Sequence, residues 1–143
     1  MESAQKTVFI SGGTSGIGLA AAEILLERGW TVAVSGRSAE RGKAALDYLN
    51  AGSRAVYMSG DVGNDEDCRR MIGETIRQFG RLDGLVTSAG YYEECLLEYT
   101  DDEQVRKMFA ANVYGTISLC RYALPYLKKT CGSIVTISSD AGL

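Results

Sequence analysis

The sequence predicts an α/β fold, a doubly wound parallel sheet with helices on both of its faces. Three observations predict it: short apolar runs rich in Val and Ile recur along the chain, longer segments with helical spacing separate them, and no linker, internal repeat or low-complexity stretch interrupts the alternation. Runs that are apolar throughout are typical of strands buried on both faces. Strand followed by helix, repeated, implies right-handed crossovers between parallel strands.

The elements follow from these patterns in chain order. The strand candidates, rich in β-branched and aromatic residues, are residues 7–11, 31–35, 55–59, 84–87 and 133–138. The helix candidates between them are residues 16–28, 39–50, 65–79 and 101–128. We expect the single proline, Pro125, to kink or end the last helix, because proline lacks a backbone donor. Ligands of such sheets bind beyond the C-terminal ends of the strands.

Composition limits the classes of function. A chain of 143 residues forms one domain, and its net charge of −3, from 15 basic and 18 acidic residues, argues against nucleic-acid binding. The polar N-terminus and the lack of a long apolar run predict no membrane segment and a cytoplasmic location. Without histidine or a CxxC pair, no metal site is expected. We expect reduced, mostly buried thiols at Cys68, Cys95, Cys120 and Cys131.

A glycine-rich loop joins the first strand to the first helix. Gly12 permits a sharp turn, Gly16 lets backbone N–H groups approach a diphosphate, and Gly18 lets the helix pack closely. The positive end of the helix carries no acidic residue before Glu23. No Gly-Lys-Ser or Gly-Lys-Thr is present, so the loop is not that of a P-loop nucleotidase. The predicted dinucleotide contacts are Gly12, Thr14, Ser15, Gly16, Ile17 and Gly18. The spacing alone is also compatible with an ordinary strand-to-helix turn.

The end of the second strand predicts which nicotinamide cofactor binds. An enzyme that prefers NAD places a carboxylate there for the ribose 2′-hydroxyl. This chain has Ser-Gly-Arg-Ser instead, so Arg37 and Ser38 are expected to bind the 2′-phosphate of NADP(H). A surface arginine at the start of a helix is the alternative.

The spacing Gly-x-x-x-Gly-x-Gly resembles that of the short-chain dehydrogenase/reductase family, and the resemblance extends along the whole chain. Asp61 and Val62, after the third strand, resemble the pair that contacts adenine in that family. Ala89 and Gly90 resemble the end of its Asn-Asn-Ala-Gly motif. The resemblance implies a Rossmann-like dinucleotide-binding domain over residues 1–143, incomplete after the fifth strand.

Two departures from the family pattern lie beside these motifs. Ser11 stands where threonine is usual, and Thr87 and Ser88 replace the paired asparagines. Ser88 retains a hydrogen-bonding side chain, so we keep it among the expected cofactor contacts. The replacement makes the geometry of the nicotinamide site harder to predict from the motif alone.

The resemblance also implies chemistry, namely hydride transfer between NADP(H) and a small carbonyl or secondary alcohol. Asn112 resembles the active-site asparagine, and Ser139 lies where the family keeps its catalytic serine. The family's proton donor is a tyrosine with a lysine four residues later, and none of the 8 tyrosines here has that lysine. A catalytic Tyr/Lys pair is therefore expected beyond the end of this chain. A non-catalytic dinucleotide-binding module, or one half of a split enzyme, is the alternative.

Three further expectations concern surfaces. Tyr91 and Tyr92, after the fourth strand, are candidates either for a substrate pocket or for exposed loop side chains. The fifth strand is expected at an edge of the sheet, where exposed backbone groups attract other chains. The expected partners are therefore a small-molecule substrate and either a second copy, in a homo-oligomer, or a complementing chain segment.

Overall fold

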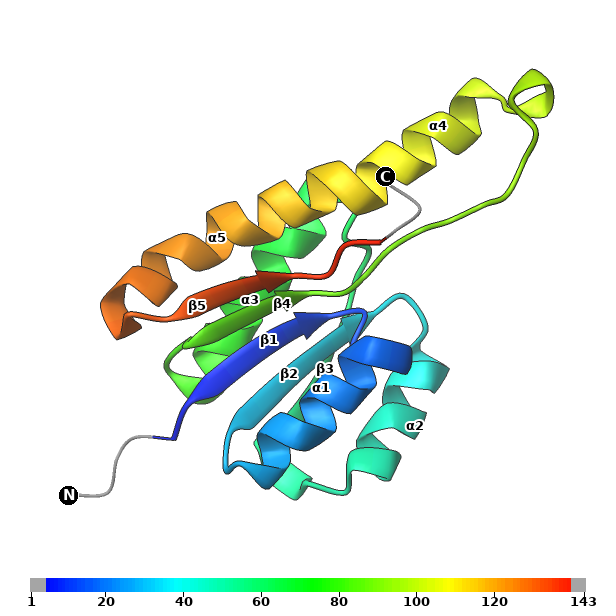
Figure 1. Cartoon of the computed structure of the whole chain (residues 1–143). Coiled ribbons are helices and arrows are strands. Elements are labelled where there is room, and N and C mark those ends of the chain that lie inside the picture. The colour runs from blue at the N-terminus through cyan, green and yellow to red at the C-terminus, as the bar shows by residue number, and fades with distance from the viewer. Residues whose placement is uncertain (1–4, 140–143) are drawn as a thin grey trace.

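The computed structural model describes residues 5–139, and its centre is a five-stranded parallel sheet in the order β3-β2-β1-β4-β5 (Figure 1). The elements are β1 (Thr7–Ser11), α1 (Gly16–Glu27), β2 (Thr31–Gly36), α2 (Ala39–Leu49), η1 (Gly52–Arg54), β3 (Ala55–Ser59), α3 (Asp65–Phe79), β4 (Gly84–Thr87), η2 (Leu97–Tyr99), α4 (Asp102–Phe109), η3 (Ala110–Tyr114), α5 (Gly115–Thr130) and β5 (Ser133–Thr136). The predicted fold class is confirmed. Strand order reverses at β1, which pairs with β2 on one side and β4 on the other.

Alternate residues of the central strands enter two different cores. Phe9 packs in a core that includes Met71 of α3 and Leu119 of α5. Val8 and Ile10 pack in the second core, with residues of α1 and α2. Every residue of β1 is buried, which is why its sequence is apolar without alternation. Helices α1 and α2 thus cover one face of the sheet, and α3 and α5 cover the other (Figure 1).

The last strand differs from its predicted length. β5 ends at Thr136, two residues before the predicted end at residue 138. It pairs with β4, which itself ends at Thr87, and the N–H of Ile137 makes a final hydrogen bond to the Thr87 carbonyl (3.0 Å). β5 is an edge strand of the described sheet, as expected, and all four of its residues are exposed.

The predicted helix over residues 101–128 is three segments in one continuous coil (Figure 1). A capping box at Asp101 starts α4, and a π-helical turn, η3, separates α4 from α5. Of the two outcomes expected for Pro125, a kink or an end of the helix, the end is wrong, because α5 continues to Thr130. Proline removes only one backbone donor. The helix ends instead where Cys131 takes a left-handed conformation with φ of 51°.

The cysteines are less buried than expected. Cys68 is buried and Cys120 is half-buried, but Cys95 and Cys131 are exposed. The expectation is wrong for the last two because they lie in a loop and at a helix end, where no second layer covers them. All four are free thiols. Within residues 5–139, no three metal-ligating side chains cluster, and no helix is both long and apolar enough to cross a bilayer.

Candidate functional site

A cavity of about 1200 Å³ lies beyond the C-terminal ends of the strands, and the segments that follow β1, β2, β3 and β4 form most of its wall. It is lined by Gly12, Thr14, Ser15, Gly16, Ile17, Ser35, Gly36, Arg37, Ser38, Arg41, Gly60, Asp61, Val62, Gly63, Asn64, Ser88, Ala89, Gly90, Tyr91, Lys107, Ala110, Ala111 and Ile137. Open α/β sheets bind their ligands at this position. Of the cofactor contacts expected from the sequence, all but Gly18 line the cavity.

The glycines of the first loop have three different surroundings. A Cβ on Gly12 would lie 2.7 Å from the Cα of Ala89, and one on Gly18 would lie 2.4 Å from the Gly12 carbonyl oxygen. Both glycines therefore allow backbone segments to touch. Gly16 has a φ of +53°, and a Cβ there would meet nothing within 4 Å. Its open face lines the cavity and leaves room for a ligand to approach the backbone.

The N-terminus of α1 borders this loop and suits an anion. Ser15 is the N-cap residue, but its side chain makes no capping hydrogen bond, and no acidic residue lies in the first turn. The first N–H groups of a helix lack intrahelical partners and carry a partial positive charge. The donor set and the space at Gly16 fit the diphosphate of a dinucleotide.

Ser11 holds the loop after β4 in place. Its Oγ accepts hydrogen bonds from the backbone N–H groups of Ser88 and Ala89, each at 3.2 Å. The replacement of threonine by Ser11 thus keeps a hydroxyl that ties β1 to the end of β4. The buried hydroxyl of Thr87 has no hydrogen-bond partner within residues 5–139, and the same is true of Ser35, which lines the cavity.

The end of β2 presents two arginines to the cavity. Ser38 caps α2 by accepting the backbone N–H of Arg41 (3.3 Å), so its hydroxyl hydrogen remains available to a ligand. Neither Arg37 nor Arg41 makes an ion pair or a side-chain hydrogen bond with any residue from 5 to 139. The sequence analysis missed Arg41. Its position three residues after a capping serine, at the start of a predicted helix, was the available signal.

Two hydrogen bonds of Asp61, one from its backbone N–H and one to its carboxylate, fix the segment after β3. The Asp61 carboxylate accepts the N–H of Gly63 (2.9 Å), and the N–H of Asp61 donates to the Asp67 carboxylate (2.9 Å). That backbone bond, followed by the hydrogen bond from Arg70, lowers the pKa of Asp67. Asp61 and Val62 therefore line the cavity on a fixed turn.

Asn112, in the π-helical turn η3, does not line the cavity but holds a residue that does. Its Oδ1 accepts the N–H of Tyr91 (2.8 Å), and its Nδ2 donates to the Tyr91 carbonyl (2.7 Å). The Tyr91 hydroxyl donates to Glu93, and this bond raises the pKa of Tyr91. Tyr91 is therefore a poor proton donor. Tyr92 is 71% exposed and is a surface side chain.

Comparison with known proteins identifies the family. The model of the family described as short chain dehydrogenase matches residues 6–143. The chain belongs to the short-chain dehydrogenase/reductase family. It is 40% identical over 140 residues to an uncharacterized oxidoreductase of Thermotoga maritima, with 96% of this chain and 55% of that protein covered. It is 36% identical to the L-fucose dehydrogenase of Bos taurus, with 97% and 51% covered. The chain thus spans about half the length of these relatives.

Solved structures share the architecture of this chain. A short-chain dehydrogenase/reductase from Brucella melitensis superposes with a TM-score of 0.90 at 29% identity, covering 99% of this chain and 60% of that one. ElxO with bound NADP superposes with a TM-score of 0.86 at 33% identity, covering 96% and 57%. An NADH-dependent reductase, A1-R′, shares the fold with a TM-score of 0.88 at 23% identity, covering 96% and 60%.

The two residues matched to catalytic positions of this family are not brought together in the cavity wall. Ser139 is exposed and follows β5, while Ile137, two residues earlier, lines the cavity. Asn112 lies behind the wall, where a Cβ on Gly90 would be 3.3 Å from its Oδ1. The cavity wall therefore contains residues expected to contact the cofactor, but neither of the two residues expected to take part in catalysis.

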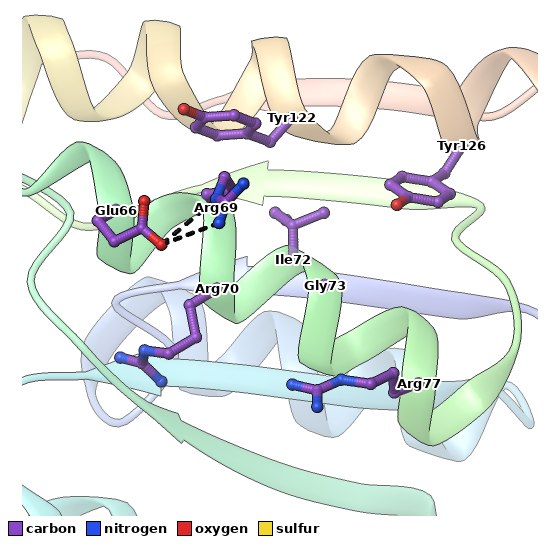
Figure 2. Close-up of a pocket in the computed structure, with 8 residues that line it drawn as sticks. All are labelled: Glu66, Arg69, Arg70, Ile72, Gly73, Arg77, Tyr122 and Tyr126. Carbon is purple, nitrogen blue, oxygen red and sulfur yellow. Dashed lines mark hydrogen bonds and ion pairs between the residues drawn. The ribbon is translucent and has the colours of Figure 1, made fainter.

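A second cavity, of about 350 Å³, lies along α3 and α5 and differs in its charges. Figure 2 shows Tyr122 and Tyr126 of α5 on one side of α3, and Arg70 and Arg77 on the other. Its arginines are paired within the chain, Arg69 with Glu66, and both Arg70 and Arg77 with carboxylates that include Glu74. These pairs leave little free positive charge for an anion.

Proposed function

We propose that this chain is the cofactor-binding part of an NADP(H)-dependent oxidoreductase that interconverts a carbonyl and a secondary alcohol. The observation that carries the proposal is the end of β2, where Arg37 lines the cavity unpaired and no carboxylate is available for a ribose 2′-hydroxyl. The NADP found in ElxO, and the dehydrogenases among the relatives, support it.

In this proposal the described residues bind and orient the cofactor. The N–H groups at the start of α1 and the open face of Gly16 hold the diphosphate, and Asp61 with Val62 borders the adenine. Ser88, Ala89 and Gly90 form the wall beside the rest of the dinucleotide, on the backbone that Ser11 fixes. NADPH, when bound, supplies the hydride.

The remaining chemistry concerns the substrate oxygen. Ser139 is proposed to donate a hydrogen bond to that oxygen, and Asn112 to help order a water relay. An unassisted serine is a weak acid at neutral pH, so a stronger donor is required. None of the 8 tyrosines precedes a lysine by four residues. The Tyr/Lys pair is therefore proposed to lie beyond residue 143 in the complete protein.

The absence of that pair from these residues also favours a second candidate, a module that binds dinucleotide without catalysing a reaction or that completes its site with another chain. Turnover separates the two. The complete protein should oxidise NADPH in the presence of a panel of carbonyl compounds. Tight cofactor binding without any turnover, in a protein with no Tyr-x-x-x-Lys segment, would support the second candidate.

We also propose a homo-oligomer. Apolar side chains at four-residue spacing are exposed along one side of α4, η3 and α5: Val105, Phe109, Val113 and Ile117. A continuous apolar stripe on a long helix is typical of a protein interface.

We also propose a reducing compartment such as the cytoplasm, because the four cysteines are free thiols.

The cofactor assignment is tested by isothermal titration calorimetry with NADPH and NADH. We expect NADPH to bind at least about 10-fold more tightly than NADH. Equal affinities would contradict the NADP(H) assignment. Binding of neither nucleotide to the correctly folded protein would overturn the dinucleotide site itself.

A further inference from the structure

Among residues 5–139, Tyr91 is the one aromatic side chain that lines the cavity beyond the strand ends. Glycines, hydroxyls and charged groups make up most of the rest of the wall. Tyr91 is half-buried, so the chain covers one part of its surface and leaves another part open. An aromatic ring presents a flat apolar face on which a planar ring of a ligand can stack.

Tyr91 shares its part of the cavity with small apolar side chains. The turn after β3 touches the π-helical turn η3, since a Cβ on Gly63 would lie 3.2 Å from the Cβ of Ala110. The loop after β4 is joined to η3 as well, through the hydrogen bonds between Tyr91 and Asn112. Ala110 therefore lies between the turn that carries Val62 and the loop that carries Tyr91. The apolar wall, as we call this part of the cavity, consists of Val62, Ala110, Ala111 and Tyr91.

The Tyr91 side chain is held at both of its ends before a ligand binds. Asn112 fixes the Tyr91 backbone with two hydrogen bonds, and the Tyr91 hydroxyl donates to Glu93. The second Glu93 oxygen accepts a hydrogen bond from Gln104 Nε2 (2.7 Å), and Gln104 belongs to the capping box that starts α4. A ring that is fixed in this way loses little conformational freedom when a ligand stacks on it.

Two cations lie within electrostatic range of the Tyr91 hydroxyl. The hydrogen bond to Glu93 raises the pKa of Tyr91, and the positive charges of Lys107 and Arg37 oppose that shift. Lys107 is on α4 and Arg37 follows β2, and both line the cavity. Tyr91 is thus near both Arg37 and the turn that carries Val62, where the adenosine half of the cofactor is proposed to bind.

We propose that Tyr91 is a binding residue that stacks on the adenine ring of the dinucleotide. The inference rests on the proposed dinucleotide binding and adds an aromatic contact to it. A purine has flat faces that suit an aromatic ring and the small side chains of the apolar wall, whereas a phosphate or a ribose has no flat face to stack. Because NADPH and NADH share the adenine, the role of Tyr91 does not depend on which of the two the protein prefers.

The test compares Tyr91→Leu, Tyr91→Phe and Tyr92→Leu by calorimetric titration of NADPH, NADH and ADP. Leucine removes the ring but keeps the backbone groups that bind Asn112, and phenylalanine removes only the hydroxyl. Tyr92 is 71% exposed and does not line the cavity, so its replacement is the matched control. We expect Tyr91→Leu to weaken all three ligands by the same factor of about 10, and Tyr91→Phe by less than about 3-fold. Tyr92→Leu should leave the three affinities unchanged.

NMR spectra of the bound ligand separate stacking from an indirect effect of the loop. An aromatic ring stacked on adenine shifts the adenine C2–H and C8–H resonances upfield. We expect this shift in the wild type and in Tyr91→Phe, and its loss in Tyr91→Leu. A shift that is the same in Tyr91→Leu as in the wild type would overturn the stacking contact.

The outcomes distinguish this inference from the proposed function. Weaker NADPH binding by Tyr91→Leu without an effect on ADP, no loss of affinity at all, or an equal effect of Tyr92→Leu would overturn the stacking role while wild-type dinucleotide binding stands. Tyr91→Phe as weak as Tyr91→Leu would overturn it too, since the hydroxyl and not the ring would then matter. A wild type that binds NADH as tightly as NADPH would overturn only the proposed cofactor preference, and one that binds none of the three ligands would overturn both.

Discussion

The side chain of Asn112 makes two hydrogen bonds with the backbone of Tyr91: its Oδ1 accepts the N–H at 2.8 Å, and its Nδ2 donates to the carbonyl at 2.7 Å. The two residues are 21 positions apart, and the bond pair joins the π-helical turn to the loop after β4. The wall of the cavity next to Gly90 therefore depends on a side chain that does not itself line the cavity.

Asn112→Ala should loosen this loop. Two exposed hydrogen bonds are lost, so we expect a decrease of about 1 kcal/mol in the free energy of unfolding and faster amide exchange at Tyr91. Hydrogen-exchange mass spectrometry of peptides from residues 88–95 measures it. Asn112→Asp keeps the acceptor for the Tyr91 N–H and should retain more protection. Unchanged exchange in the alanine variant would show that other contacts hold the loop.

Gly18→Ala and Gly73→Ala should have opposite effects. A Cβ on Gly18 would lie 2.4 Å from the Gly12 carbonyl oxygen, so the loop must shift, and both stability and dinucleotide binding should fall. Gly73 lies inside α3 with nothing within 4 Å, so alanine there should stabilise the fold by about 0.5 to 1 kcal/mol. Thermal melts measure both. A Gly18→Ala variant as stable as wild type would refute the close contact.

Asp83 should link stability to acid pH. It is 6% exposed and accepts hydrogen bonds from the Thr7 N–H (2.8 Å) and Arg81 Nε (2.8 Å). Burial raises the pKa of Asp83, but these bonds and the charges of Arg81 and Lys6 outweigh it, so the pKa lies below its ordinary value. Its stabilising contribution is complete above the unfolded pKa of about 3.9 and is lost as pH falls through the native pKa.

Asp83→Ala should therefore cost about 3 kcal/mol at pH 7, because it removes the buried carboxylate that pairs with Arg81 and accepts the Thr7 N–H. Urea unfolding from neutral to acid pH measures the effect, and the difference between variant and wild type should shrink below about pH 4. Asp47→Ala, an exposed change on α2, serves as the control. A difference that stays constant down to acid pH would contradict the linkage.

Arg37→Ala should weaken NADPH binding by about 1.5 to 3 kcal/mol, or on the order of 10- to 100-fold, because a charge-assisted contact with the 2′-phosphate is removed. NADH binding should be nearly unchanged, since it offers no phosphate at that position. Titration of both cofactors measures the difference. Equal losses for the two would refute the assignment of Arg37.

The edge strand should make the isolated 143-residue chain associate with itself or require a partner. Ile134 is 39% exposed and Val135 51%, and the outer backbone groups of β5 pair with no strand in the described sheet. Light scattering after size-exclusion chromatography measures the association. Val135→Lys should reduce it, whereas Ala44→Lys on the exposed side of α2 should not. A monodisperse monomer that melts cooperatively would contradict this expectation.

Residue preferences along the sequence were sufficient to predict much of the fold and the glycine loop of the candidate site. The apolar runs predict β1, β3 and β4 to the residue, because strands buried on both faces admit little but β-branched and aromatic side chains. The glycine loop could also be predicted from the sequence, because its glycine spacing is required by backbone contacts between residues close in the chain. The Gly12 carbonyl beside Gly18 is an example.

The features missed from the sequence depend on distant segments. The π-helical turn around Asn112 lies inside a segment that the sequence predicts as one continuous helix. β5 ends at Thr136, opposite Thr87, which is the last residue of its partner strand β4. Arg41 joins Arg37 only because Tyr57 sets the first turn of α2 against the end of β2.

The sequence by itself thus determined the alternation of strands and helices, the turn that faces a diphosphate, and the lack of a carboxylate at the end of β2. Only the tertiary structure decided which side chains share the cavity, which cations remain unpaired and which residue holds Tyr91. The physical reason is the distance along the chain over which each interaction acts. Backbone preferences act over a few residues, whereas the cavity is made by strand ends that parallel crossovers bring together from distant parts of the chain.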